Sequence, residues 1–218
     1  MTLEAMNETK EALEDALDNL EKVKDEHERY KKEVEKIKES LDKGDYFHCG
    51  TITLSNKAVV SDPSYALYTW CAAILDNVLP GEYNCYLRFK DYKGWGMRVV
   101  ELMVTHKDYP DIRFANDFKS EEYDIGVDSG MCGIYDFEYF DKIKESESDN
   151  EDWLMNRVFP TTYDQQYGIL RGGTLDSKCI ISSTGFGDGS YDLFTKKDEA
   201  GNIIGMMVMY IYDIDEED

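Results

Sequence analysis

Three aspartates stand where runs of apolar residues break, and carboxylates held in turns are able to do chemistry. They are Asp62 in Val-Ser-Asp-Pro-Ser-Tyr, Asp128 in Gly-Val-Asp-Ser-Gly and Asp188 in Gly-Phe-Gly-Asp-Gly-Ser-Tyr. If the three turns meet at one end of a sheet, the carboxylates could form a hard-cation site or an acid–base pair. The alternative is structural: each Asp accepts a hydrogen bond from the backbone two residues on and holds its own turn. Both interpretations stay open from the sequence.

Hydroxyl groups flank these carboxylates, and Ser129 and Ser190 are candidate nucleophiles. A serine nucleophile needs a base within reach, and after residue 45 the only histidines are His48 and His106, neither of them in a motif. The glycine-rich string Gly185–Gly189 lacks the Lys-Ser/Thr end of a phosphate-binding Walker loop, although its N–H groups could hold an anion. The candidate ligand-binding residues are Asp62, Tyr65, Asp128, Ser129, Asp188, Ser190 and Tyr191.

Aromatic residues near the same turns could form a stacking pocket for a base or a peptide. Most of them are expected in the core or on the surface of a sheet. The residues considered are Tyr65, Tyr68, Trp70, Tyr83, Trp95, Tyr135 and Tyr191.

The composition limits the class of partner. The formal net charge of −22 argues against binding a nucleic-acid backbone or an anionic membrane, and it permits a basic protein, a cation or mimicry of nucleic acid. The five cysteines form no Cys-x-x-Cys pair, so neither a disulfide scaffold nor a zinc site is expected. No signal peptide or membrane span is recognised. These features predict a protein of the bacterial host cytoplasm with no cofactor and no metal.

Heptads of apolar residues in the first 44 residues predict a long coiled-coil helix that ends near Gly44 and assembles several copies of the chain. His27 lies in the seam, where it could fix the register or make assembly depend on pH. A helix that folds back on its own domain is the alternative. The predicted oligomerisation residues are Leu13, Leu20, Val23, His27, Tyr30, Val34, Ile37 and Leu41.

Residues 45–218 predict a β-rich globular domain with an acidic C-terminal tail. Overall the fold class is mostly β (α+β with the helices counted), an antiparallel β-sandwich or curved sheet with short helices plus the long N-terminal helix. Phe137–Lys144 is a predicted helix, Tyr68–Leu75 one or two helical turns, and Glu145–Asp152 and Thr161–Thr174 loops. The predicted strands are His48–Leu54, Ala58–Val60, Tyr83–Phe89, Met97–His106, Tyr123–Val127, Met131–Tyr135, Lys178–Ser182, Tyr191–Thr195 and Ile203–Ile211. The last three are expected to follow one another in a β-meander, with the Gly-Asp-Gly corner between the first two.

The three aspartate motifs, in this order and with Pro80-Gly81-Glu82-Tyr83 between the first two, resemble the domain of unknown function 4241 family of bacteria and their phages. The resemblance covers about residues 47–212 and leaves out the N-terminal helix. Members commonly have cysteine where this chain has Ser64, so a thiol at that position plays no part here. The family has no assigned activity, and its occurrence in phages suggests an accessory or anti-defence role by association only.

We therefore expect a non-enzymatic interaction protein, phage or prophage encoded and oligomerised by its coiled coil, that presents its β domain to a protein or a small ligand. The alternative is a metal-assisted hydrolase, or a protein that sequesters a small ligand such as a nucleotide, built on Asp62, Asp128 and Asp188. Nucleic-acid mimicry is a third interpretation, and it needs the negative charge to form a stripe on the folded domain.

Overall fold

A computed structural model describes residues 17, 19–25, 28, 32, 46–92, 94–109, 118–164 and 169–212 of the chain. The chain divides into two units, Met1–Asp45 and Tyr46–Asp218, and each is described by itself. Within the described residues, no helix has the length and apolar character needed to cross a membrane.

The long N-terminal coiled-coil helix in the predicted fold class is wrong for the part of the chain that the structure describes. In the first unit the described residues, all of them helical, are 17, 19–25, 28 and 32. Leu20 and Val23, two of the predicted seam residues, have 52% and 49% of their surface exposed. Apolar spacing stabilises a helix only when it buries apolar surface, and within one copy of the chain about half the surface of each of these two side chains stays exposed. The other predicted oligomerisation residues lie outside the described residues: Leu13, His27, Tyr30, Val34, Ile37 and Leu41.

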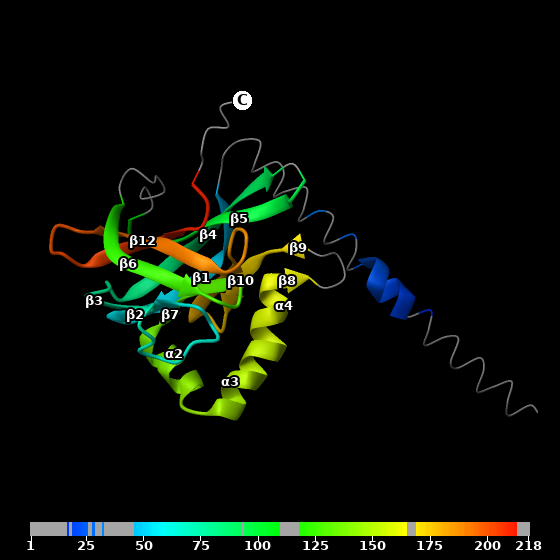
Figure 1. The fold of residues 1–218 in the computed structure, drawn as a ribbon, viewed down its shortest axis with the longest axis horizontal. Helices are drawn as coiled ribbons and strands as arrows, with labels where there is room; N and C mark the ends of the chain where they lie inside the picture. The colour runs from blue at the N-terminus through cyan, green and yellow to red at the C-terminus, as the bar shows by residue number, and fades with distance from the viewer. Residues whose placement is uncertain are drawn as a thin grey trace, which may run out of the picture. The chain divides into compact units, whose positions relative to one another are not determined.

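The second unit is mostly β and is built on two antiparallel sheets (Figure 1). The larger has six strands in the order β1-β4-β5-β13-β12-β6. Buried and partly exposed side chains alternate along the β12 sequence Tyr-Asp-Leu-Phe-Thr, which is the pattern of a sheet with one covered face, whereas the central strands β5 and β13 are buried along most of their length. The bounds are β1 Phe47–Leu54, β4 Gly81–Tyr92, β5 Gly96–His106, β6 Lys119–Val127, β12 Gly189–Lys197 and β13 Ile203–Met209.

The smaller sheet has five strands in the order β10-β11-β7-β2-β3. Its central strands are buried along their whole length, so both faces of this sheet are covered. A separate two-stranded ribbon pairs β8 with β9. The bounds are β2 Lys57–Ser61, β3 Ala73–Asp76, β7 Met131–Asp136, β8 Tyr163–Asp164, β9 Ile169–Leu170, β10 Gly172–Leu175 and β11 Cys179–Ser183.

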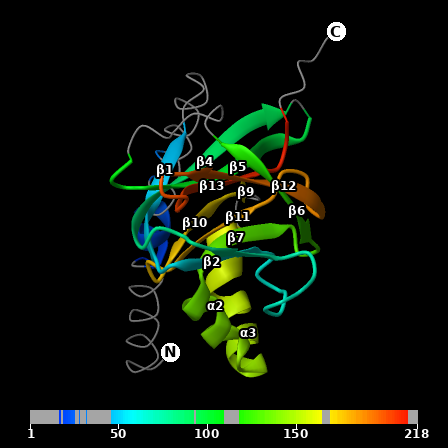
Figure 2. The same ribbon diagram turned by 90° about the vertical axis from the view of Figure 1, so that its left-hand side faces the viewer.

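Short helices cover one face of the five-stranded sheet, on the side away from the six-stranded sheet (Figures 1 and 2). They are α2 Phe137–Lys144, α3 Glu147–Trp153, a π-helical segment Leu154–Val158 and α4 Phe159–Thr162. Asp136 caps α2 by accepting the Tyr139 N–H. Phe140, Trp153 and Val158 pack against strand residues such as Tyr135 and Ile181 to form an apolar layer. The domain therefore has three layers: sheet, sheet and helices.

Four local predictions need correction. Tyr68–Leu75 is not helical: the loop after β2 makes turns and then enters β3. Glu145–Asp152 is not a loop, since it contains most of α3, which ends with the buried Trp153. Thr161–Thr174 contains the end of α4 and three short strands among its described residues. The predicted C-terminal meander is wrong at its first step, because β11 pairs with β7 and β10 and not with β12; its second step is confirmed, since β12 pairs with β13.

The last correction decides where a site can form. The glycine-rich loop between β11 and β12 does not join neighbouring strands; it passes from the five-stranded sheet to the six-stranded sheet. The Asp128-Ser129-Gly130 turn between β6 and β7 makes the reverse passage. The two crossings are adjacent, since the Thr184 N–H donates to the Gly130 carbonyl at 3.0 Å. Two motifs distant in sequence thus meet at one end of the two sheets.

Candidate functional site

Asp62 is fully buried and joins the first motif to the second. Its Oδ2 accepts the N–H groups of Asp128 (2.9 Å) and Ser129 (2.7 Å), and its Oδ1 accepts the Ser129 hydroxyl (2.8 Å). The N–H and the hydroxyl of Ser64 also donate to Oδ1, each at 2.7 Å. A carboxylate offers about four lone pairs, so these five hydrogen bonds leave none for a metal or a substrate proton. The role that the geometry gives Asp62 is structural: it fixes both turns.

The remaining residues of the first two motifs surround this carboxylate. Burial first, and then a hydrogen bond to the Asp128 carboxylate, raise the pKa of the half-buried Tyr65. The Gly126 N–H donates to the Cys71 carbonyl at 3.0 Å, which holds the loop after β2 against β6. A Cβ on Gly126 would lie 2.7 Å from the Cys71 sulfur, so this motif glycine is required by close approach.

The third motif lies beside the second but adds no carboxylate to Asp62. Ser190 pairs with Gly126 in the β12–β6 ladder and is exposed, as is Asp188. Tyr191 is buried, and its hydroxyl donates to the Gly187 carbonyl. The N–H groups of Gly185 and Gly187 donate to the carbonyls of Val99 and Thr184, so these two amides are not available to hold an anion.

The three aspartate turns converge, but their carboxylates do not. Asp62 is buried whereas Asp128 and Asp188 are exposed. Among the residues that the structure describes, no three His, Cys, Asp or Glu side chains are grouped as metal ligands would be. The geometry therefore favours the structural interpretation for Asp62 and offers no cation site to the other two.

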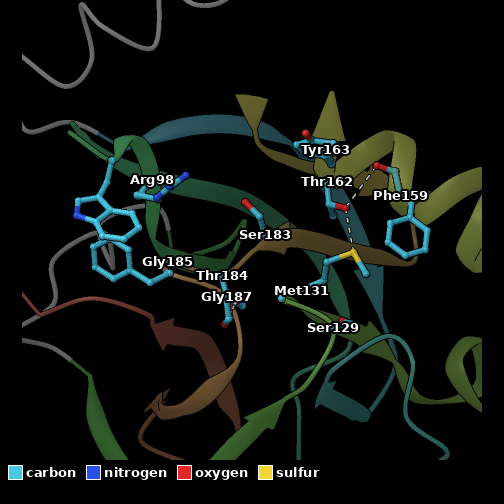
Figure 3. Close-up of a pocket in the computed structure, with 13 residues that line it drawn as sticks. Arg98, Ser129, Met131, Phe159, Thr162, Tyr163, Ser183, Thr184, Gly185 and Gly187 are labelled. Atoms are coloured by element: carbon cyan, nitrogen blue, oxygen red, sulfur yellow. Dashed lines mark hydrogen bonds between the residues drawn. The ribbon is translucent and has the colours of Figure 1, made fainter. Parts of the chain in front are cut away.

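What the converging turns form is a pocket of about 290 Å³. Its wall includes Ser129 and Gly130 from the second motif and Thr184–Gly187 from the third. Figure 3 shows Arg98 of β5 on one side of the pocket and Phe159, Thr162 and Tyr163 on the other, with Ser183 between them. The remaining lining residues are Trp95 in the β4–β5 turn and Met131 of β7. No Asp, Glu, His, Cys or Lys is among the described residues of this wall.

Aromatic rings form much of the pocket wall. Trp95 and Phe186 make an edge-to-face pair with ring centroids 5.9 Å apart, and Tyr92 makes a second edge-to-face pair with Phe186 at 5.3 Å. Trp95 and Phe186 are nevertheless 67% and 57% exposed. Phe159 and Tyr163 are also partly exposed. Such a concave aromatic surface with a few polar groups is typical of small-ligand sites.

Lys144 contacts the first motif and lies in an unusual environment for a lysine. Its Nζ donates to the Pro63 carbonyl and to Asn150 Oδ1 (2.6 Å), and it lies 5.0 Å and 5.6 Å from the ring centroids of Phe140 and Trp153. Burial lowers the pKa of Lys144 to about 8, while the Asp62 carboxylate acts weakly in the opposite direction. Lys144 therefore links helix α2 to the Asp62 turn.

The lowered pKa of Lys144 predicts a pH-dependent stability. Its ordinary value is 10.5 and its folded value is about 8, so between these pH values the unfolded chain binds more protons than the folded chain. The difference in the free energy of unfolding between the native protein and Lys144→Met should therefore increase from pH 8 to 10.5. This stabilisation of the native protein should be lost as pH falls through 8. Urea unfolding of both proteins at pH 7, 8.5 and 10 measures this difference.

The matched control is Lys142→Met, which changes an exposed lysine of the same helix. Its difference from the native protein should be flat over the same pH range. Equal pH slopes for the two variants would contradict the lowered pKa of Lys144.

Sequence reasoning placed Trp95 among possible stacking residues but missed Arg98, Phe159, Tyr163, Ser183 and Thr184. No local motif surrounds Arg98, which reads as an ordinary charged residue on a strand. The one usable signal was indirect. A hydroxyl residue followed by Gly comes shortly after the end of a strand in two places, Ser129-Gly130 after β6 and Thr184-Gly185 after β11, and both pairs line the pocket. Of the predicted site residues only Ser129 lies in its wall.

The fold and the site define a class of protein: a two-sheet β domain with a ligand-sized pocket where its loops cross between sheets. The family model described as "Protein of unknown function (DUF4241)" matches residues 52–208, and the chain belongs to this family. No curated protein and no solved structure matches the chain.

Proposed function

We propose that this domain is a non-catalytic binding protein for a small ligand, held in the pocket between the second and third motifs. The observation that carries the proposal is the wall itself: both motifs contribute to one aromatic pocket of about 290 Å³. This volume is at the small end of the range for ligand pockets, so the pocket suits a compact molecule.

Binding without catalysis is favoured by the chemistry of the wall. The Ser129 hydroxyl donates a hydrogen bond to Asp62, and the other lone pairs of this carboxylate accept hydrogen bonds from backbone N–H groups and from Ser64. A general base must be free to take a proton, and the described wall residues supply no other carboxylate, imidazole or amine. The metal-assisted hydrolase built on Asp62, Asp128 and Asp188 has no such support.

Removing one aromatic ring of the pocket wall should weaken ligand binding. Trp95→Ala and Phe186→Ala each take away an exposed ring of the pocket, and stacking on such a ring is worth about 0.5–1.5 kcal/mol beyond its buried area. We expect at least about a fivefold loss of affinity for any aromatic fragment that binds the native protein. Saturation-transfer NMR with a library of one- and two-ring fragments finds the binders, and titration gives the affinities.

Trp70→Ala is the matched control, because Trp70 is 93% exposed and lies outside the pocket wall. It should bind the same fragments as the native protein. Fragments that bind all three variants equally, or a library with no binder, would contradict the proposal.

Protein binding is a second candidate, favoured by one observation. Tyr68 and Trp70 lie close together in the loop after β2 and are 74% and 93% exposed. Tyr and Trp are the residues most enriched at the centres of protein interfaces. A role as a phage-encoded accessory protein in the bacterial cytoplasm remains a prediction beside both candidates, and Trp70→Ala in a pull-down from host lysate tests the protein-binding one.

A further inference from the structure

We propose that the ligand of this pocket is a flat aromatic ring that carries a negatively charged group, and that Arg98 binds this group. The inference rests on the proposed function and adds the chemical class of the ligand and its orientation. Nucleoside monophosphates and amino- or hydroxy-substituted aromatic carboxylates share this chemistry.

The position of Arg98 is the first argument. Its Nε is buried and has no hydrogen-bond partner among the described residues. Burying a charged donor without an acceptor is costly, and native proteins seldom do so without a reason. Arg88 and Arg157, by contrast, pair with the carboxylates of Glu101 and Asp176. An anion in the pocket would give Arg98 the acceptor it lacks, in the two-pronged geometry that guanidinium groups favour.

Three of the five hydroxyls in the pocket wall, those of Ser129, Ser183 and Thr184, are the second argument, because they cannot compete for the anion. The hydroxyl of Ser129 donates to Asp62, that of Ser183 to the Arg171 carbonyl at 3.3 Å, and that of Thr184 to the Gly187 carbonyl at 2.6 Å. Each hydroxyl has a single proton, so these three present only lone pairs to a ligand. Lone pairs repel an anion and accept from N–H or O–H groups. The ligand is therefore expected to carry hydrogen-bond donors away from its charged group.

The aromatic wall places the ring. Trp95 precedes Arg98 in the same hairpin and pairs with Phe186, so a flat ring stacked there lies beside the guanidinium. The carboxylates of Asp128 and Asp188 are next in sequence to the wall residues Ser129 and Gly187, but they lie outside the wall and are exposed to solvent, which weakens their effect on a bound anion.

Calorimetric titration of the full chain with matched probes tests the proposal. The pairs are adenosine monophosphate with adenosine, and 4-aminobenzoate with 4-aminobenzamide; inorganic phosphate is a fifth probe that lacks the ring. We expect the charged member of at least one pair to bind roughly 10- to 100-fold more tightly than its neutral counterpart. The pair that shows the difference identifies the phosphate or the carboxylate as the natural group. Inorganic phosphate alone should bind weakly.

Arg98→Gln should remove this preference, so that the charged and neutral members bind alike, and Arg98→Lys should keep part of it. Arg157→Gln is the matched control, since Arg157 pairs with Asp176 on the surface, and it should bind like the native protein. The melting temperatures of all three variants are measured first, and Arg98→Lys serves if Arg98→Gln does not fold.

Neutral probes that bind as tightly as charged ones would overturn this inference and leave the proposed function standing. An unchanged preference in Arg98→Gln would do the same. If no probe of either kind binds, and the fragment library also gives no binder, the inference and the proposed function fall together.

Discussion

Replacing Asp62 by alanine is expected to lower the free energy of unfolding by about 3–5 kcal/mol, as removal of a partner from a buried charged network does. The carboxylate accepts five hydrogen bonds from three residues of two separate loops. Alanine leaves three backbone N–H groups without acceptors, and each buried orphan costs about 1–3 kcal/mol. Urea unfolding followed by circular dichroism at pH 7 measures the effect.

Asp62→Asn keeps the shape of the side chain but replaces one acceptor oxygen by an NH₂ donor. The backbone N–H of Ser64 faces one oxygen and those of Asp128 and Ser129 face the other. In either orientation of the Asn amide, its NH₂ group faces a backbone N–H. Both groups are donors, so no hydrogen bond forms between them. We therefore expect a loss of about 1–3 kcal/mol from a change of a single atom.

Asp188→Ala is the control for both variants, because Asp188 is exposed in its turn. Its effect should stay within about 0.5 kcal/mol. Should Asp62→Ala and Asp188→Ala prove equally stable, Asp62 does not hold the two turns together. Asp62→Asn is also expected to weaken binding of any pocket ligand, since Ser129 and Gly130 would lose their anchor.

Phe140→Ala should have the next largest effect, a loss of about 3–5 kcal/mol. Phe140 is fully buried, its ring centroid lies 4.6 Å from that of Tyr135, and it forms one wall around Lys144. Alanine would leave a cavity between helix α2 and strand β7 and free the Lys144 ammonium, which anchors the Pro63 carbonyl. Urea unfolding at pH 7 measures the loss.

Phe186→Ala is the matched control for this core substitution. Phe186 is 57% exposed, so its removal should cost no more than about 1 kcal/mol while ligand affinity falls. If Phe140→Ala were no more destabilising than Phe186→Ala, the helices would not be packed on the five-stranded sheet as described.

Elements with strong local signals were predictable from the sequence. Phe137–Lys144 is a helix over the predicted bounds, because Asp136 caps it and its apolar residues recur at helical spacing. The hairpin of β4 and β5 was predicted from two alternating runs around a glycine turn. The Asx-type turn at Asp62 was also foreseeable, since the Ser64 N–H donates to its side chain. In each case the deciding contacts lie within a few residues.

Long-range choices were not predictable. The run Cys179–Ser183 reads as a strand, but nothing in it says that its partner is Met131–Asp136 rather than the next strand along the chain. The wrong pairing would have placed the glycine-rich loop in a hairpin and closed the space that the pocket occupies. Arg98 joins this pocket only because β5 lies beside both crossings, and a charged residue on a strand carries no signal of that arrangement.

The position of β13 has a consequence for how the protein is made. It is the last of the described strands in the chain, yet it lies inside the six-stranded sheet, hydrogen-bonded to β5 on one side and β12 on the other. A ribosome delivers β5 long before β13, so the growing chain carries an open strand edge until synthesis passes Met209. Open edges recruit other strands. Chains released early by a stop codon before β13 should therefore aggregate, and the nascent protein should depend on chaperones that shield β5.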